Sequence, residues 1–285
     1  MAGVRAATGS GEGPIAVFDS GVGGLTVLKE LLQCLPHDRF VYFGDTARVP
    51  YGTKSAVTVR RYSREDTAFL LRFRPKLIVV ACNTASAAGL DVVSLEAKVP
   101  VVGVIEPGAR RAVASRAGGA VGIIGTESTI ASRSYYRAIR ALDAGAELWE
   151  RACPLLVPMI EEGRGPDDAL LLAAIEEYLS PIRGRVGALV LGCTHYPLIK
   201  AALAAAMGPH VVLVDSADEV AGTVADALTA EGLADTSGSG WMRCYVSDNP
   251  ERFRAIGERF LQAPLRDVTL VEPDDFLATE RVAVP

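Results

Sequence analysis

Two cysteines, Cys82 and Cys193, stand in closely similar sequence contexts. Cys82 follows the apolar run LIVVA and precedes NTAS, and Cys193 follows ALVLG and precedes THYP. Each run has the near-continuous hydrophobicity of a strand that is buried on both faces of a parallel sheet. The polar residues after it then form a loop at the carboxyl end of the strand, where open α/β sheets bind ligands. The sequence therefore predicts two similar half-sites with one thiol each.

Thiols in this setting can carry protons. We expect each sulfur to lie near the N-terminus of the following helix, where the partial positive charge favours a thiolate. A cysteine pKa is ordinarily about 8.5, so a modest lowering would let a thiol give or take a proton near neutral pH. Asp19 and His195 could order the proton on the two sulfurs. Two thiols facing each other across one carbon could remove a proton from one face and deliver one to the other, which inverts a stereocentre.

Polar loops at predicted strand ends make up the rest of the candidate site. Lys54 is the only lysine near them, so an acidic ligand would depend on neutral hydrogen-bond donors and on free backbone N–H groups at helix N-termini. The loops are Asp19-Ser20-Gly21, Pro50-Tyr51-Gly52, Cys82-Asn83-Thr84 and Cys193-Thr194-His195, and the further residues are Thr126, Glu161 and Glu162.

Apolar runs that predict strands alternate along the chain with segments of helical spacing. Such regular alternation is typical of parallel sheets with helices on both faces, so we predict the α/β class. Predicted strands cover residues 14–19, 39–44, 77–81, 100–105, 120–125, 147–152, 187–191, 210–215, 241–246 and 268–271. Predicted helices cover residues 25–35, 55–74, 85–97, 108–117, 130–142, 167–179, 197–207, 217–231 and 250–261.

These elements form two series, which predict two domains. We expect one α/β domain from residues 13–107 together with 216–285, and a second from 108–215, with boundaries near Pro107 and Asp215. The C-terminal part is expected to return to the first domain because it begins after the second series is complete. Residues 1–12 are predicted to be a flexible tail, since they are small and lack the apolar core of a secretory signal.

Composition limits the classes of function. The chain has 285 residues, 49% of them hydrophobic and 22% charged, and a net charge of −5. A mildly acidic chain without basic clusters is not expected to bind nucleic acid, and no apolar run is long enough to suggest a membrane span. The five cysteines are widely spaced and form no CxxC pair. They predict free thiols and a cytoplasmic location, with Cys34, Cys153 and Cys244 as buried apolar side chains.

Four strings carry a resemblance to a known family. VFDSGVGGLTVL, YFGDTARVPYG, VVACNTAS and LVLGCTHYP closely resemble the glutamate racemases, a cofactor-independent group within the aspartate/glutamate racemase superfamily. The similarity covers residues 14–276. It implies two pseudo-symmetric α/β domains with the active site between them. It also implies interconversion of L- and D-glutamate without a cofactor, the supply of D-glutamate for bacterial peptidoglycan, and a homodimer.

The resemblance also implies roles for individual residues. Cys82 and Cys193 match the two acid/base cysteines, with Cys82 taking the α-proton of D-glutamate and Cys193 that of L-glutamate. Asp19 matches the auxiliary residue of Cys82, and His195 with Glu161 matches the auxiliary pair of Cys193, although the adjacent Glu162 could be the matching carboxylate. The positions that match substrate contacts are Asp19, Ser20, Pro50, Tyr51, Gly52, Asn83, Thr84, Thr126, Thr194 and His195.

Other interpretations of the same residues remain open at this point. Cys193-x-His195 with Cys82 and Asp19 could bind zinc, although the close ligand pairs typical of structural zinc are missing. Asp19 could cap a loop or helix, and Thr126 could cap the next helix. The whole chain could be a racemase of aspartate or hydantoin, a decarboxylase, an amino-acid binding protein with inert thiols, or a protein with a regulatory partner.

Overall fold

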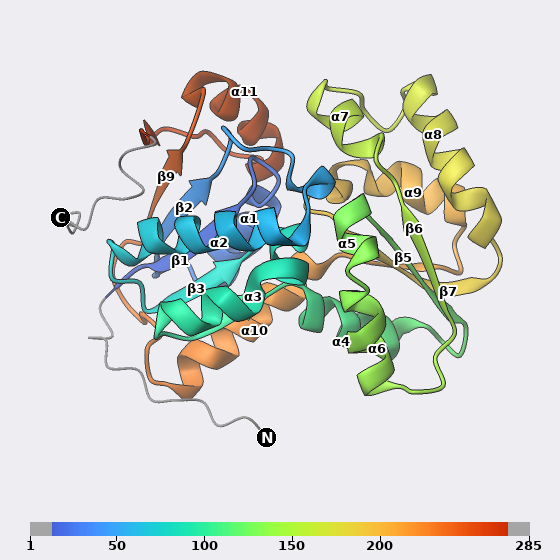
Figure 1. The fold of residues 1–285 in the computed structure, drawn as a ribbon, viewed down its shortest axis with the longest axis horizontal. Coiled ribbons are helices and arrows are strands. Elements are labelled where there is room, and N and C mark those ends of the chain that lie inside the picture. Colours follow the sequence, from blue (N-terminus) through green and yellow to red (C-terminus); the bar gives the residue numbers. More distant parts are fainter. Residues whose placement is uncertain (1–12, 273–285) are drawn as a thin grey trace.

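The computed structural model describes residues 13–272; the predicted tail, residues 1–12, lies outside them. Within residues 13–272, ten strands form two parallel sheets (Figure 1). The larger sheet has the order β10-β9-β2-β1-β3-β4, and the smaller has the order β6-β5-β7-β8. The strands are β1 (Ile15–Asp19), β2 (Arg39–Gly44), β3 (Leu77–Val80), β4 (Val101–Gly103), β5 (Ala120–Gly125), β6 (Leu148–Ala152), β7 (Val186–Gly192), β8 (Val212–Val214), β9 (Trp241–Val246) and β10 (Val268–Leu270).

The two sheets repeat one topology. Strands β2-β1-β3-β4 of the larger sheet and β6-β5-β7-β8 of the smaller have the same arrangement. In each, the strand that is second in the chain comes first, followed by the first, third and fourth. In such a sheet the strand order reverses between the first and third strands, and the crevice beyond their carboxyl ends is the usual ligand site. The two crevices lie beyond β1 and β3 and beyond β5 and β7. The predicted α/β class is confirmed.

Helices cover both faces of the larger sheet. Alternate residues of β1 belong to separate apolar clusters: Ile15 and Val17 pack on the side of α1, and Ala16 and Phe18 on the side of α2. The helices are α1 (Leu25–Cys34), α2 (Ala56–Leu71), α3 (Asn83–Ala97), α4 (Ile105–Ser115), α5 (Glu127–Ala131), α6 (Ser134–Leu142), α7 (Leu156–Glu161), α8 (Ala169–Leu179), α9 (Lys200–Met207), α10 (Ser216–Ala230) and α11 (Pro250–Leu261), with 3-10 turns η1 (Tyr51–Thr53), η2 (Ser180–Ile182) and η3 (Tyr196–Ile199).

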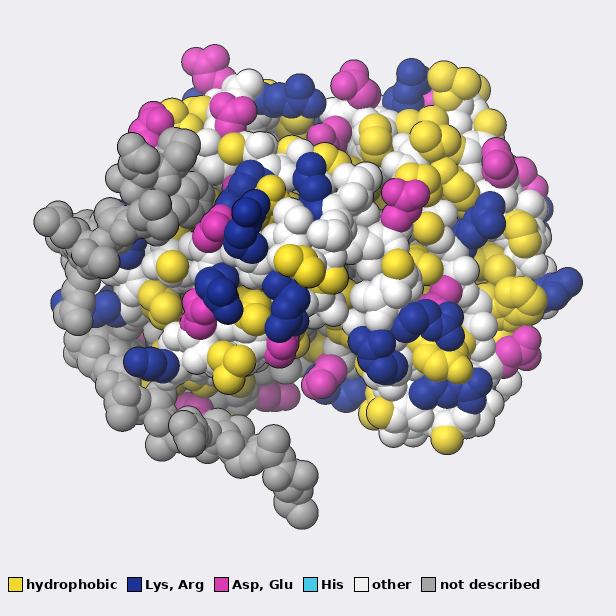
Figure 2. All heavy atoms as spheres, viewed as in Figure 1, with side chains coloured by type: hydrophobic (Ala, Val, Ile, Leu, Met, Phe, Trp, Pro, Cys, Tyr) yellow, Lys and Arg dark blue, Asp and Glu magenta, His cyan; other side chains and the backbone are white. Residues whose placement is uncertain are grey.

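The C-terminal strands extend the sheet that the N-terminal strands begin, because β9 pairs with β2. Helix α4 connects the two sheets and contacts both α10 and β7. Positive and negative side chains are interspersed over the face in Figure 2, with arginines gathered over α6. Between residues 13 and 272, no helix combines the length and hydrophobicity that a bilayer crossing requires.

Several element boundaries differ from the predictions. Helix α4 begins at Ile105, so Pro107 lies in its first turn, where a missing N–H removes no helical bond. The helix predicted over residues 130–142 is two helices, because Arg133 adopts a left-handed backbone with φ +57°. The helix predicted over 197–207 is the 3-10 turn η3 followed by α9. Helix α7 was not predicted, and Cys34 is exposed rather than buried.

Candidate active site

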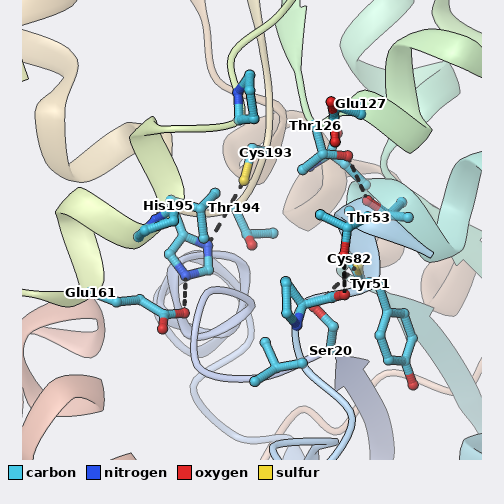
Figure 3. Close-up of a pocket in the computed structure, with 18 of the residues that line it drawn as sticks. Ser20, Tyr51, Thr53, Cys82, Thr126, Glu127, Glu161, Cys193, Thr194 and His195 are labelled. Atoms are coloured by element: carbon cyan, nitrogen blue, oxygen red, sulfur yellow. Dashed lines mark hydrogen bonds and ion pairs between the residues drawn. The ribbon is translucent and has the colours of Figure 1, made fainter. Parts of the chain in front are cut away.

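A cavity of about 260 Å³ lies beyond the carboxyl ends of the central strands of both sheets. Cys193, His195 and Glu161 lie on one side of it in Figure 3, and Cys82, Tyr51 and Thr53 on the other. Its lining includes every predicted site residue except Asp19 and Gly21. The lining residues are Ser20, Val49, Pro50, Tyr51, Gly52, Thr53, Cys82, Asn83, Thr84, Thr126, Glu127, Cys153, Pro154, Val157, Pro158, Glu161, Glu162, Cys193, Thr194 and His195.

Cys82 is the N-cap of α3, directly after β3. Its sulfur accepts a hydrogen bond from the backbone N–H of Ala85 at 3.4 Å and donates to Ser20 Oγ at 3.6 Å. Burial raises the pKa of this thiol to about 12, and the nearby charge of Asp19 adds to the rise. The expected lowering by the helix N-terminus is therefore wrong for Cys82, since desolvation outweighs it. Cys82 is a protonated thiol at neutral pH.

Cys193 follows the equivalent strand β7, but no α-helix begins beside it. The chain passes through the turn η3, which contains Pro197, and α9 starts only at Lys200. The expectation that a helix N-terminus flanks both thiols is therefore wrong on this side. Instead, the sulfur lies 3.8 Å from Nδ1 of His195. The group that neighbours Cys193 is therefore an imidazole, whereas the group that neighbours Cys82 is a helix N-terminus.

His195 joins Cys193 to a carboxylate. Its Nε2 lies 3.0 Å from Oε1 of Glu161, whereas Glu162 lines the same cavity beside it. Burial alone would lower the pKa of His195, but its hydrogen bonds and charge interactions with Cys193 and Glu161 raise it to about 10. The pKa of Glu161 is lowered, because the hydrogen bond and charge of His195 and the charge of Arg252 outweigh burial. An imidazolium–carboxylate pair thus stands behind Cys193.

This pair makes the stability of the fold depend on pH. The pKa of His195 rises from its usual 6.5 to about 10 on folding, so its stabilising effect is complete below pH 6.5 and is lost as pH rises toward 10. We expect urea unfolding to show that wild type loses about 1.5–3 kcal/mol relative to His195→Asn between pH 6 and pH 10, as for a hydrogen bond to a charged group. Parallel stability curves for the two proteins would contradict the assignment.

Asp19 ends β1 and lies beneath the cavity rather than on its wall, with no exposed surface. Its Oδ2 accepts from the backbone N–H of Gly21 at 2.9 Å, and its Oδ1 accepts from Thr194 Oγ1 at 3.4 Å. Burial raises its pKa, partly offset by the charge of His195. Asp19 therefore forms the loop turn and also links the two half-sites.

Tyr51 turns its phenol away from the cavity (Figure 3). Its hydroxyl lies within hydrogen-bonding distance of Asp45 and of Asp66 Oδ2, the latter at 2.9 Å, and Arg48 pairs with both carboxylates. Only 1% of Tyr51 is exposed, so this network anchors the loop. The loop therefore presents mainly backbone to a ligand.

Hydroxyl groups join the two halves on the far side of the cavity. Thr84 at the start of α3 lies 2.9 Å from Thr126 and 3.2 Å from Thr129, measured between Oγ1 atoms. Thr126 also caps α5, accepting from the Thr129 N–H. A β-carbon on Gly52 would lie 2.6 Å from Cβ of Thr126, so only glycine lets the loop approach this closely. Asn83 is fixed by Tyr135, whose hydroxyl donates to Oδ1 at 2.7 Å.

The described lining contains no lysine or arginine, and Lys54 is not part of it. Its acidic residues are Glu127, Glu161 and Glu162. Between residues 13 and 272, no group of three or more His, Cys, Asp or Glu side chains is arranged to hold a metal ion. Sequence reasoning missed Val49, Thr53, Glu127, Cys153, Pro154, Val157 and Pro158. Cys153 follows strand β6 as the other two thiols follow theirs, so its strand-end position could have revealed it.

Comparison with known proteins places the chain in a family. The model of the Asp/Glu/hydantoin racemases matches residues 24–224. The chain belongs to this family. A member from Geobacter metallireducens, a glutamate racemase, is 53% identical over 256 residues, which cover 89% of this chain and 94% of that relative. A glutamate racemase of Thermus thermophilus is 50% identical and covers 86% of this chain and 91% of its own length.

Solved structures of family members share the two-domain fold. Glutamate racemase from Francisella tularensis in complex with D-glutamate has a TM-score of 0.87 at 38% identity, covering 92% of this chain and 98% of that one. The Thermus thermophilus enzyme in complex with β-chloro-D-alanine has a TM-score of 0.85 at 47% identity, covering 93% and 99%. An aspartate racemase from Picrophilus torridus, at 18% identity and TM-score 0.56, shares the fold alone.

Proposed function

We propose that this racemase interconverts L- and D-glutamate by a two-base reaction without a cofactor, and supplies D-glutamate for peptidoglycan. The observation that carries the proposal is the pair of thiols, Cys82 and Cys193. Each follows the equivalent strand of its sheet, and both line one cavity. Relatives that are about half identical carry the name glutamate racemase, and this supports glutamate as the substrate.

The two half-sites differ in a way that assigns the proton transfers. Cys82 rests as a thiol, ready to give a proton, whereas Cys193 stands beside an imidazolium that stabilises a neighbouring thiolate. With L-glutamate bound, the Cys193 sulfur takes the α-proton, and Cys82 delivers its own proton to the opposite face. When D-glutamate has formed, Cys193 is a thiol and Cys82 is a thiolate. Starting from D-glutamate, the same steps run in reverse. Asp19 assists Cys82, and His195 with Glu161 assists Cys193.

Uncharged groups, together with the His195 imidazolium, hold the substrate in this proposal. The contacts are assigned to Ser20, Pro50, Tyr51, Gly52, Asn83, Thr84, Thr126, Thr194 and His195, with Tyr51 contributing backbone. Removing an α-proton builds negative charge on the substrate carboxylate. Fixed N–H and O–H donors in a water-poor cavity stabilise that charge without reorganising during the reaction.

Circular dichroism of the purified protein with glutamate tests the function. We expect the signal of L-glutamate to decay to zero without added cofactor, and that of D-glutamate to decay to the same end point. Decay with aspartate but not with glutamate would assign another substrate. Binding of glutamate without decay of either signal would make the protein an amino-acid binding protein and would refute the proposal.

Three further proposals concern the organisation of the protein. Residues 13–107 with 216–272 form one domain and 108–215 the other, and they close over the substrate; the two sheets support this division. The predicted first domain also includes residues 273–285, which lie outside the described residues. A homodimer follows from the family resemblance.

The five unpaired cysteines support a reducing cytoplasmic location.

A further inference from the structure

Helix α11, from the C-terminal part of the chain, lies behind the Cys193 half-site. Its residue Phe260 packs edge-on against the imidazole of His195, with ring centroids 5.1 Å apart. Arg259 of the same helix reaches the end of α7, where a β-carbon on Gly163 would lie 3.7 Å from its Nη1. Figure 1 shows α11 and α7 facing each other across the top of the view.

A second cavity, of about 310 Å³, lies between these helices and shares Glu161 and Val49 with the first. Among the described residues that line it, Arg252 is the only cation and Asp248 the only other charged group besides Glu161. The side chain of Asn249 caps α11 by accepting from the Arg252 N–H at 3.0 Å. This cap places Arg252 in the first turn, where the positive end of the helix adds to its charge.

We propose that Arg252 is a positioning residue that acts through Glu161 on His195 and Cys193. The inference rests on the proposed function of that half-site. Glu161 is half-buried, and burial alone would favour its protonated form. A protonated Glu161 would no longer hold the imidazolium in place. Positive charge from Arg252 across the second cavity adds to the larger effect of His195 in favouring the ionised carboxyl, and so strengthens the pair that orients His195 beside the thiol.

The charges that face Glu161 come from several elements. His195 contacts it directly, Glu162 is its neighbour in the chain, Asp248 and Arg252 line the second cavity, and Arg259 lies near Gly163. Within the described part of the chain, Arg252 forms no ion pair of its own. It is exposed, so added salt should screen its effect.

Carbon-13 NMR of the glutamate carboxyl groups tests the proposal, with the Glu161 signal assigned from Glu161→Gln. We expect Arg252→Gln to raise the pKa of Glu161 by about half a unit, and Arg252→Lys to keep it near wild type. Added potassium chloride should raise the pKa of Glu161 in the wild type toward its value in Arg252→Gln, and should leave the pKa in that variant unchanged. The acid limb of the pH profile of kcat/KM should move in the same direction.

Arg254→Gln is the matched control, because it removes the same charge from the same helix. Arg254 donates to the carbonyl of Leu265 and does not line the second cavity. Equal titration of Glu161 in Arg252→Gln and Arg254→Gln would overturn the inference. The NMR readout needs no turnover, so a protein that fails to racemise glutamate would refute the proposed function and still report on Arg252.

Discussion

Cys82→Ser slows glutamate racemisation by about 10²- to 10⁴-fold, the range expected for loss of one general acid/base group. Serine keeps the size and the hydrogen bonds of the side chain, but its hydroxyl is a far weaker acid than a thiol. Cys193→Ser should slow the reaction by a similar factor, because each turnover uses both sulfurs. Polarimetry with L- and with D-glutamate measures both effects.

Cys244→Ser is the control for this pair. Cys244 is also buried, with 1% of its surface exposed and its pKa raised by burial to about 12, but it lies in β9 outside the cavity. We expect the racemisation rate of Cys244→Ser to stay within about twofold of wild type, since Cys244 touches no reacting group. A Cys82→Ser enzyme of nearly wild-type rate would contradict the role of Cys82.

Gly23→Ala is expected to lower kcat by about 10²-fold, although Gly23 is not part of the cavity wall. A β-carbon there would lie 2.2 Å from Thr194 Oγ1 and 2.6 Å from His195 Nδ1. Neither distance is sterically possible, so the loop that carries Cys193 and His195 must shift. Steady-state kinetics of the purified variant measure the loss.

Gly222→Ala makes the same chemical change where there is room. A β-carbon at Gly222, in α10, meets nothing within 4 Å, so this variant should keep full activity and gain about 0.4–1 kcal/mol of stability. If Gly23→Ala turned over glutamate as fast as Gly222→Ala, the close packing of the β1 loop on His195 would not matter for the reaction.

The sequence predicted most of the strands because their physical signal is strong. Strands of a parallel sheet are covered on both faces, so runs such as residues 77–80 are apolar without interruption. The break between α5 and α6 has no such signal, because it depends on a left-handed Arg133 and on Ser132, whose hydroxyl donates to the Thr129 carbonyl at 2.6 Å. The short helix α7 was not predicted because Pro154 and Pro158 argue against a helix, although proline is acceptable in a first turn.

The sequence predicted which residues form the site better than it predicted their pKa values. Strand-end positions and family strings identified Cys82, Cys193 and His195, because loops after parallel strands meet at one edge. The pKa of Cys82 could not be predicted, since it depends on how completely neighbouring side chains exclude water. The direction of the Tyr51 phenol and the approach of Arg252 are also set by packing between segments far apart in the chain.

Exchange of the α-proton in D₂O, followed in the two cysteine variants, tests most directly whether one sulfur serves each face of the substrate. In Cys82→Ser, Cys193 still takes the α-proton of L-glutamate and returns solvent deuterium to the same face. We therefore expect L-glutamate to gain deuterium while D-glutamate stays unlabelled, and the opposite pattern in Cys193→Ser. Full and equal exchange of both enantiomers in either variant would contradict the two-base arrangement.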